Sequence, residues 1–427
     1  MNAGRRRFVQ LLGSSAIAAA TAPAPAYITQ PLPAEQKLRH HYQSKNVPAE
    51  SAVTLCTADL AWLDGECRRL LAGCRRTALD GTALFTPDGS GHYGALWTRD
   101  FAYMVEGAGD LLSLGEIEAA IRYLLRCQKP DGTVPDRVQI DGRPVYSAGP
   151  AAAPLGAPPT DNSQFLVKLV WSHWKLAGEA SLAREALPQL LRAMDAVPRR
   201  QGLVWIDPKV PRSPYGFTDS VGKSGMELFS SLLYWEASRD LAEMCGSFNL
   251  PNCRKDFAER AGRIERALSQ LWSGKEDALL AATVACRQVD VWGNAYAIYI
   301  GFPLGGRRAR VLNFLEKNLN SYAWCGQIRH LLRGQYWSRL LVRVKPDTYQ
   351  NGGHWGTASG WVAYALSLRR PDLASRLYWE LLDDYRRGGP CEWISPGTRR
   401  LSTYVVSAAN PRAALRKLRS EGRLQAR

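Results

Sequence analysis

The sequence predicts an all-α protein in which about six helical hairpins close a ring, an (α/α)6 barrel. Apolar residues recur at three- and four-residue spacing along most of the 427-residue chain, whereas alternating, strand-like stretches are few and short. Clusters of polar and aromatic residues recur at long, similar intervals, as expected of repeated hairpins that share one core. No linker divides the chain into halves of different composition, so we expect a single domain.

The first 26 residues are expected to be an export signal and not part of the fold. Three arginines at 5–7 precede Phe8 and a weakly apolar run over 11–22, and the sequence Ala-Pro-Ala-Pro-Ala ends at residue 26. A basic region, a short apolar region and a small-residue cleavage site are together typical of a secretory signal. Paired arginines are typical of the twin-arginine type. The protein is therefore expected to be periplasmic or extracellular.

From residue 27 to residue 427 the chain is expected to form the barrel and a basic C-terminal tail. Helical periodicity covers nine segments: 52–76, 115–127, 161–177, 182–196, 224–245, 254–272, 307–319, 355–369 and 371–387. Strand-like alternation is limited to 202–206 and 338–344. Six basic residues and one acidic residue lie within 412–427, which we interpret as a solvated helix face or tail.

The polar-aromatic clusters lie where loops run into predicted helices. They are Trp97-Thr98-Arg99-Asp100, Thr160-Asp161-Asn162, Thr218-Asp219, Asp290-Val291-Trp292, Tyr349 to Trp355 and Cys391-Glu392-Trp393. Steps of 61, 58 and 71 residues separate the acidic residues of the first four clusters, which suits one hairpin plus a loop for each step. Clusters at equivalent helix ends meet at one face of a ring. The sequence thus predicts one cavity lined by Arg99, Asp161, Asp219, Trp292, His354 and Glu392.

Composition and charge exclude several classes of protein. Hydrophobic residues make up 46% of the chain, which excludes intrinsic disorder. The net charge of +16 is spread along the chain without an aromatic-interleaved basic patch, so no nucleic-acid partner is expected. No apolar run after the N-terminus is long enough for stable membrane insertion. The nine cysteines and six histidines lack the clustering of a metal site, so no metal is expected. Disulfide pairing and oligomeric state stay open.

The aromatic residues favour a carbohydrate substrate. Fourteen Trp and 17 Tyr exceed what a helical core needs, and many lie in the loop clusters beside carboxylates and amides. Sugar rings present flat C–H faces and a rim of hydroxyl groups, which aromatic platforms and polar side chains match. Hydrolysis of a glycoside needs two carboxyl groups, one acid and one base, and no cofactor.

Three segments resemble those of the six-hairpin glycosidase superfamily. Trp97-Thr98-Arg99-Asp100 resembles the Trp-x-Arg-Asp segment of glucoamylases. The run from Tyr349 to Trp355 is similar to the Tyr-His-Asn-Gly-Gly-x-Trp segment of alkaline and neutral invertases, and to related segments of trehalases and glycogen debranching enzymes. Glu392-Trp393 and the turn that follows resemble the late Glu-aromatic segment of the same group. Together these motifs cover roughly residues 80–411.

The resemblance implies a general acid at Asp219 and a general base at Glu392. It further implies that Arg99 and Asp100 bind hydroxyl groups of the terminal sugar. The remaining residues expected to bind substrate are Trp97, Asp161, Asn162, Gln164, Lys223, Trp292, Asn294, Asn351, His354, Trp355 and Trp393. Two departures from the invertase pattern concern the substrate: Ser220 and Val221 replace the two arginines that follow the acid, and Gly356 replaces a proline.

The expected function is that of an exported, inverting, exo-acting glycoside hydrolase. Burial beside Tyr215 and Phe217 is expected to raise the pKa of Asp219, while Glu392 is expected to stay ionised in a wetter place. The acid limb of the pH–rate profile would then come from Glu392 and the basic limb from Asp219. The identity of the sugar, its linkage and anomer, and whether the substrate is anionic stay open.

Two other functions and one other role remain as alternatives. Sugar epimerases use the same barrel with pairs of histidines, for which His92, His173, His330 and His354 are the candidates. A non-catalytic glycan-binding protein would retain the cleft without turnover. Asp219 itself has a structural alternative, since its carboxylate would also suit the N-cap of the following helix.

Overall fold

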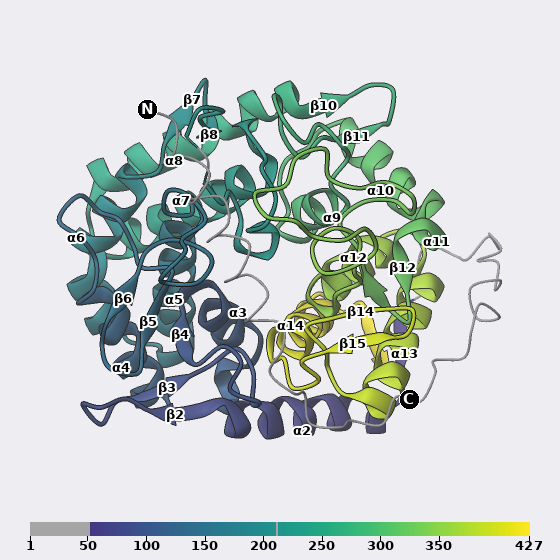
Figure 1. The fold of residues 1–427 in the computed structure, drawn as a ribbon, viewed down its shortest axis with the longest axis horizontal. Coiled ribbons are helices and arrows are strands. Elements are labelled where there is room, and N and C mark those ends of the chain that lie inside the picture. Colours follow the sequence, from purple (N-terminus) through teal and green to yellow (C-terminus); the bar gives the residue numbers. More distant parts are fainter. Residues whose placement is uncertain (1–51, 211) are drawn as a thin grey trace, which may run out of the picture. The chain divides into compact units, whose positions relative to one another are not determined.

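The inner layer of the fold is a closed ring of six helices. The computed structural model describes residues 52–210 and 212–427, so the predicted export signal lies outside the described residues. The inner helices are α3(Thr98–Ala108), α5(Asn162–Ala177), α7(Leu228–Ser247), α9(Val291–Tyr299), α12(Ser359–Ser367) and α14(Val406–Ser420). Each contacts the next along the chain, and α14 contacts α3, which closes the ring (Figure 1).

Six outer helices alternate with the inner ones along the chain. They are α2(Thr57–Cys74), α4(Leu114–Leu125), α6(Ser181–Asp195), α8(Pro251–Ala267), α10(Arg307–Lys317) and α13(Pro371–Gly388). Helix α2 packs against α14, α4 and α6 against α5, α8 against α7, α10 against α9 and α12, and α13 against α12. A one-turn helix, α11(Leu319–Tyr322), follows α10. The prediction of an (α/α)6 barrel is confirmed.

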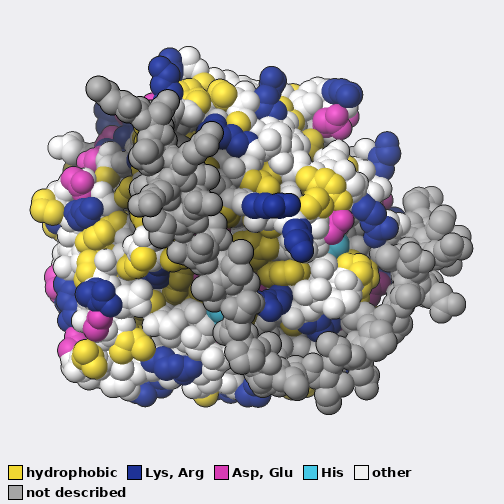
Figure 2. Space-filling view, in the orientation of Figure 1, with side chains coloured by type: hydrophobic (Ala, Val, Ile, Leu, Met, Phe, Trp, Pro, Cys, Tyr) yellow, Lys and Arg dark blue, Asp and Glu magenta, His cyan; other side chains and the backbone are white. Residues whose placement is uncertain are grey.

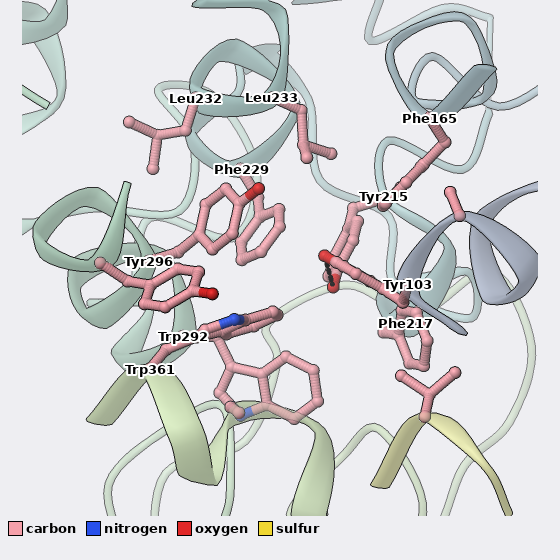
Figure 3. Packing of buried hydrophobic residues seen from close by; sticks show 14 of the residues in the cluster. Tyr103, Phe165, Tyr215, Phe217, Phe229, Leu232, Leu233, Trp292, Tyr296 and Trp361 are labelled. Carbon is pink, nitrogen blue, oxygen red and sulfur yellow. Dashed lines mark hydrogen bonds between the residues drawn. The ribbon is translucent and has the colours of Figure 1, made fainter. Parts of the chain in front are cut away.

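The inner helices are more fully buried than the outer ones, and two of them, α9 and α12, are buried on every side. All nine residues of α9 and all nine of α12 are buried. Aromatic rings from different inner helices meet in the middle of the ring, where Phe229 and Tyr296 of neighbouring helices stack with centroids 4.8 Å apart (Figure 3). The hydroxyl groups of Tyr103 and Tyr215 share a hydrogen bond of 3.2 Å. A helix that is buried on every side lacks a polar stripe, which is why periodicity did not predict helices over 98–108, where ten of eleven residues are buried, and over 291–299. The helix over 406–420 was not predicted because its basic residues were interpreted as a solvated face or tail.

The C-terminal segment differs from the predicted tail. Residues 406–420 form the inner helix α14, in which Arg412 is buried. Its guanidinium group donates to Asp64 at 2.6 Å and to Asp110 at 2.7 Å. Strand β16(Leu424–Ala426) then pairs in parallel with β1(Val53–Leu55). Helix α14 therefore belongs to the barrel, because burial of its apolar face and the two ion pairs of Arg412 fix it there. The other basic residues of the segment are exposed or half-buried, as expected of a solvated helix face.

Short strands form ribbons in the loops between helices. The pairs are β2(Arg75–Thr77) with β3(Ala83–Phe85), β10(Trp272–Ser273) with β11(Ala278–Leu279), β12(Ala323–Trp324) with β13(Gln327–Ile328), and β14(Trp393–Ser395) with β15(Thr398–Arg400). Two sheets have three strands: β4(Ala95–Trp97), β5(Arg137–Gln139) and β6(Pro144–Val145), and β7(Arg199–Arg200), β8(Leu203–Ile206) and β9(Gly225–Met226). Strand β8 falls within the predicted segment 202–206, whereas 338–344 has only an isolated bridge at Leu340.

These ribbons help to position the functional residues, because several of them run directly into inner helices. Strand β4 ends at Trp97, and α3 begins at the next residue. Strand β9 ends two residues before α7 begins, so the helix predicted over 224–245 starts later than expected. None of the helices in the described part of the chain is long and apolar enough to cross a membrane.

Candidate active site

A pocket of about 370 Å³ opens where loops lead into the inner helices. Its walls come from segments before α3, before α7, before α12 and before α14. The described residues that line it are Pro87, Tyr93, Trp97, Arg99, Asp100, Gly216, Phe217, Asp219, Tyr349, Gln350, Trp355, Glu392 and Tyr404. Three carboxyl groups and several aromatic rings therefore face one small space, although their residues span most of the barrel sequence.

Six of the residues predicted from the sequence line this pocket. They are Trp97, Arg99, Asp100, Asp219, Trp355 and Glu392. The sequence did not single out Pro87, Tyr93, Gly216, Phe217, Tyr349, Gln350 or Tyr404 as site residues. Tyr349 and Gln350 lie within the motif that ends at Trp355, so the motif itself was a signal for them. Tyr93 and Tyr404 are identified only by the carboxyl groups to which they donate, and no local pattern shows those pairs.

The other predicted binding residues lie behind the pocket wall. They are Asp161, Asn162, Gln164, Lys223, Trp292, Asn294, Asn351, His354 and Trp393, and all are buried. The expectation that Asp161, Trp292 and His354 would line the cavity with the catalytic pair needs correction. Lys223 instead pairs with Glu227 and Asp290, and several of the other side chains bond the backbone of neighbouring loops or pack in the core. The amide of Asn294, for example, exchanges hydrogen bonds with the backbone of Leu279.

Several of these buried residues have identifiable structural roles. Asn351 accepts a hydrogen bond from the backbone N–H of Trp337 at 3.0 Å. Burial, with Arg329 and Arg333 nearby, lowers the pKa of His354 to about 3, so its imidazole is neutral. The Trp292 indole donates to a backbone carbonyl at 3.3 Å and stacks on His330. Such contacts fix the loops that bear the pocket-lining residues.

Arg99 is the only cationic side chain among the described pocket-lining residues, and buried carboxylates already bind it. Its Nη1 lies 2.8 Å from Asp136 Oδ1, and its Nε lies 3.4 Å from Asp161 Oδ2. Burial opposes its charge, but these two carboxylates raise the pKa of Arg99 and keep it ionised. A Cβ atom on Gly216 would lie 1.6 Å from Arg99 Nε, so only glycine fits against the guanidinium group.

Asp219 follows the short 3-10 helix Gly216–Thr218 and faces the pocket. Its structural alternative as a helix cap is not observed, because Glu227 is the N-cap of α7 and accepts from Ser230 N at 2.6 Å. Burial raises the pKa of Asp219 to about 6, although Arg99 and a hydrogen bond from Gln350 oppose the rise. Asp219 therefore has the raised pKa that was predicted for it.

Gln350 is fixed in an orientation that directs its N–H groups to Asp219. Its Oε1 accepts from the backbone N–H of Ser220 at 2.8 Å and from the Ser220 hydroxyl at 2.6 Å. The amide nitrogen therefore faces the other way and donates to Asp219 Oδ1 at 2.8 Å. This amide holds the Asp219 carboxyl group in place without adding a charge.

Glu392 is buried, in contrast to the wetter surroundings that were expected. Only 5% of the residue is exposed, and its Oε1 accepts a hydrogen bond from the Tyr93 hydroxyl at 2.5 Å. Burial, together with the charges of Asp100 and Asp219, raises the pKa of Glu392 to about 8 despite that bond. The expected order of the two pKa values is therefore reversed, because Glu392 has no ion pair with a cation of the described chain.

Asp100, in the first turn of α3, is a second buried carboxyl group that accepts a hydrogen bond from a tyrosine hydroxyl. The Tyr404 hydroxyl donates to Asp100 Oδ1 at 2.6 Å. Burial raises the pKa of Asp100 to about 6, opposed by this hydrogen bond and by Arg99. The pocket thus contains carboxyl groups that titrate at and above pH 6, as general acid–base chemistry near neutral pH requires.

No histidine is among the described residues that line the pocket. His330 is buried behind it, with Nε2 at 3.1 Å from the carbonyl oxygen of Phe217. The pair of histidines that an epimerase would need is therefore not found at this site. The described residues also contain no group of three or more His, Cys, Asp or Glu side chains placed to bind a metal ion.

Comparisons by sequence find no matching family model and no matching curated protein. Solved structures do match. GH63 mannosylglycerate hydrolase from Thermus thermophilus, in complex with glucose, is 18% identical with a TM-score of 0.62, over 82% of this chain and 99% of that one. A rhamnosidase from Klebsiella oxytoca with rhamnose bound is 15% identical with a TM-score of 0.62, over 88% of this chain and 66% of that one.

A GH78 rhamnosidase of Bacillus sp. GL1 also matches, with 14% identity and a TM-score of 0.59. It aligns with 84% of this chain and 35% of its own. At such identities the likeness shows the fold. It agrees with the (α/α)6 barrel that the sequence predicted.

Proposed function

We propose that the protein is an exported glycoside hydrolase that releases single sugars from the ends of short saccharides or small glycosides, with inversion at the anomeric carbon. The observation that supports this most is that Asp219 and Glu392 line one small pocket with aromatic side chains. The two carboxyl groups come from separate hairpins and have different hydrogen-bond donors. The structural neighbours with glucose and rhamnose bound use the same barrel for glycosides.

The pKa values of about 6 for Asp219 and about 8 for Glu392 mean that a single proton on the pair resides mainly on Glu392, so the reaction proceeds from the less populated form in which Asp219 holds it. In that form Asp219 gives its proton to the glycosidic oxygen as the bond from that oxygen to the anomeric carbon breaks. Glu392 takes a proton from the water that attacks this carbon from the opposite side, so the products are a free sugar and an alcohol. After the reaction Asp219 is ionised and Glu392 is protonated. Glu392 then loses a proton to solvent and Asp219 takes one up, which restores the starting state. Gln350 and Tyr93 position the two carboxyl groups.

The size of the pocket supports an exo mode of attack. The space of about 370 Å³ includes part of the open mouth, and thirteen described residues line it closely. Trp97, Phe217 and Trp355 provide flat apolar faces within it. A pocket of this size suits one sugar ring, with the rest of the substrate at the mouth.

Two features support export. The N-terminal arginines and the short apolar run are typical of a twin-arginine signal. Cys245, at the end of α7, forms a disulfide with Cys253, near the start of α8, and disulfides persist in oxidising compartments. Replacing the arginines at 5 and 6, the pair with Phe8 two residues on, by lysine should leave the protein in the cytoplasm. Periplasmic protein from that variant would contradict the export route.

The test of the activity is a screen with the mature protein. Aryl α-mannosides, α-glucosides and α-rhamnosides, and disaccharides of the same sugars, would be incubated with wild type and with D219N and E392Q. We expect single sugars from the wild type only. Proton NMR of the first product identifies the anomer, and retention of the substrate's configuration would contradict the role given to Glu392. Early products of mixed length would contradict the exo mode.

A further inference from the structure

Among the described residues that line the pocket, no cation is free to bind an anionic group. Arg99 is ion-paired with Asp136 and Asp161. The carboxyl groups of Asp100, Asp219 and Glu392 face the same space. A carboxylate on the buried sugar would lose its hydration there and meet only other acidic groups, which is unfavourable. The buried sugar is therefore uncharged.

The segment beside the pocket has the opposite charge. We call residues 331–348 the basic wall, which leads into the pocket residues Tyr349 and Gln350. Its buried Trp337 donates through Nε1 to the carbonyl oxygen of Gln350 at 2.8 Å. Trp337 also packs in a small apolar cluster with Val221 and Leu331. The wall is thus anchored to the loops that form the site.

Backbone contacts place the wall next to the loop that follows Asp219. The N–H of Gly222 donates to the carbonyl oxygen of Arg339 at 3.0 Å, and the N–H of Leu341 donates to that of Ser220 at 2.8 Å. The Arg339 side chain lies directly over Gly222, where a Cβ atom would come within 2.8 Å of its Cγ. The wall therefore runs alongside the three residues after the proposed general acid.

Four cations of the wall are exposed and form no ion pair within the described residues: Arg333, Arg339, Arg343 and Lys345. Asp347, the one acid of the wall, lies 3.3 Å from Arg329 and accepts from the Tyr336 hydroxyl at 2.8 Å. On this face of the molecule, Lys and Arg side chains lie close to exposed hydrophobic ones near the centre (Figure 2). The wall thus contains four exposed cations that are unpaired within the described chain, and it runs next to the loop that follows Asp219, whereas the pocket contains three carboxyl groups.

From this difference in charge we infer that the natural substrate joins an uncharged sugar to an anionic leaving group, and that the basic wall recognises that group. The inference rests on the proposed function, because it is the exo mode that directs the leaving group to the mouth. An anionic group at the mouth gains attraction from the four cations and stays clear of the three pocket carboxyl groups. The basic wall thereby selects substrates by the charge of their leaving group.

The experiment compares two aryl glycosides of whichever sugar the screen identifies. One has a 4-carboxyphenyl leaving group and the other a neutral 4-carbamoylphenyl leaving group. The quantity measured is the ratio of their kcat/KM values. Comparing this ratio between proteins cancels the intrinsic difference between the leaving groups. The wall variant is R333Q/R339Q/R343Q/K345Q, and the matched control R68Q/R254Q/K255Q/R266Q removes four exposed cations from the outer helices α2 and α8.

We expect the wild type and the control to prefer the carboxylate substrate, and the wall variant to lose this preference by about tenfold. Raising the salt concentration from about 0.05 to about 0.5 M should weaken the wild-type preference in the same direction, which tests the inference even if the wall variant does not fold. A ratio that neither the variant nor salt changes would overturn the inference while leaving the hydrolase intact. Cleavage of neither substrate would overturn the proposed function itself.

Discussion

Two groups of buried acids lie at the same end of the barrel, and their surroundings shift the pKa values of Asp290 and Glu392 in opposite directions. In the first group, Asp290 and Glu227 share the ammonium group of Lys223, at 3.2 and 3.1 Å. Burial disfavours the charge of Asp290, but Lys223 and hydrogen bonds to the carboxylate lower its pKa to about 2. In the second group, Glu392 accepts from the neutral phenol of Tyr93, and its pKa is raised to about 8.

The difference shows that burial alone does not make a carboxyl group a proton donor or acceptor. Both Asp290 and Glu392 are at least nine-tenths buried. A full positive charge beside a buried acid fixes it as a carboxylate, whereas a neutral donor leaves its proton free to move at physiological pH. The Lys223 cluster thus serves the fold, and the pocket acids are suited to chemistry. This contrast predicts different results for matched substitutions in the two groups.

The largest effect is expected on activity when the pocket acids lose their ability to titrate. Glu392→Gln and Asp219→Asn keep the shape of each side chain but neither exchanges a proton. Each should lower kcat by a factor of about 10³ or more while leaving the folded structure intact. The measurement is kcat on the best glycoside of the screen, with circular dichroism to monitor folding. Lys223→Met, in the other group, acts mainly on stability.

The second prediction concerns that stability. Lys223→Met leaves Glu227 and Asp290 buried without a cation, so it should lower the free energy of unfolding by about 3–5 kcal/mol. Denaturant unfolding measures the change. The matched control is Lys417→Met on α14, which removes an exposed pair with Glu421 and should cost about 0–1 kcal/mol. Equal losses for the two variants would show that the buried cluster does not stabilise the fold.

The fold was largely predictable from the sequence because the outer helices are amphipathic. Helices such as α6 and α13 have one buried face and one exposed face, so apolar residues recur with helical spacing. Inner helices such as α9 bury every face, and their sequences show no period to detect. The recurring clusters supplied the missing information, since each marks the loop before an inner helix. The ring was thus predicted without three of its inner helices.

The site was predictable only in part, for a physical reason. Motifs pointed to Asp219 and Glu392, which the structure brings to one pocket. The motifs pointed equally to Lys223 and Asn294, which are buried and do not line the pocket. A local pattern shows that a polar residue lies at a helix junction but not which distant side chain is its partner. The pairing of Tyr93 with Glu392 joins residues 299 positions apart, and only the fold reveals it.

The third prediction sharpens the comparison through the pH dependence of stability. The pKa of Glu392 rises from about 4.3 in an unfolded chain to about 8 in the fold. Its contribution to stability is therefore present at low pH and is lost as the pH rises through this interval. The side chain introduced by Glu392→Gln does not titrate. The melting temperature of this variant minus that of wild type should therefore increase by a few degrees between about pH 5 and about pH 9.

Asp290→Asn serves as the contrasting variant in the same measurement. The pKa of Asp290 is lowered to about 2, so its contribution to stability is present above its unfolded pKa and is lost only as the pH falls towards 2. The difference in melting temperature between Asp290→Asn and wild type should therefore be nearly constant between about pH 5 and about pH 9. If the difference in melting temperature from wild type changes with pH for both variants, or for neither, the opposite pKa shifts of Glu392 and Asp290 are contradicted.

The smallest effect is expected from the neutral donor of Glu392. The Tyr93 hydroxyl stabilises the ionised form of Glu392, so Tyr93→Phe should raise the pKa of Glu392 still further. A bell-shaped pH–rate profile reports pKa values that belong to the coupled pair of acids. The upper limb, near pH 8, should move up by about half a unit to one unit, and the lower limb should move less because Gln350 continues to donate to Asp219.

Gln350→Leu provides the reciprocal variant, because Gln350 lowers the pKa of Asp219 from the other side of the pocket. It should raise the lower limb, near pH 6, and leave the upper limb almost unchanged. If the two substitutions move the same limb, the two donors do not act on separate acids. If neither moves a limb while both lower kcat, Tyr93 and Gln350 support only the shape of the pocket. Separate movement of the two limbs is therefore the outcome that assigns each titration to its own carboxyl group.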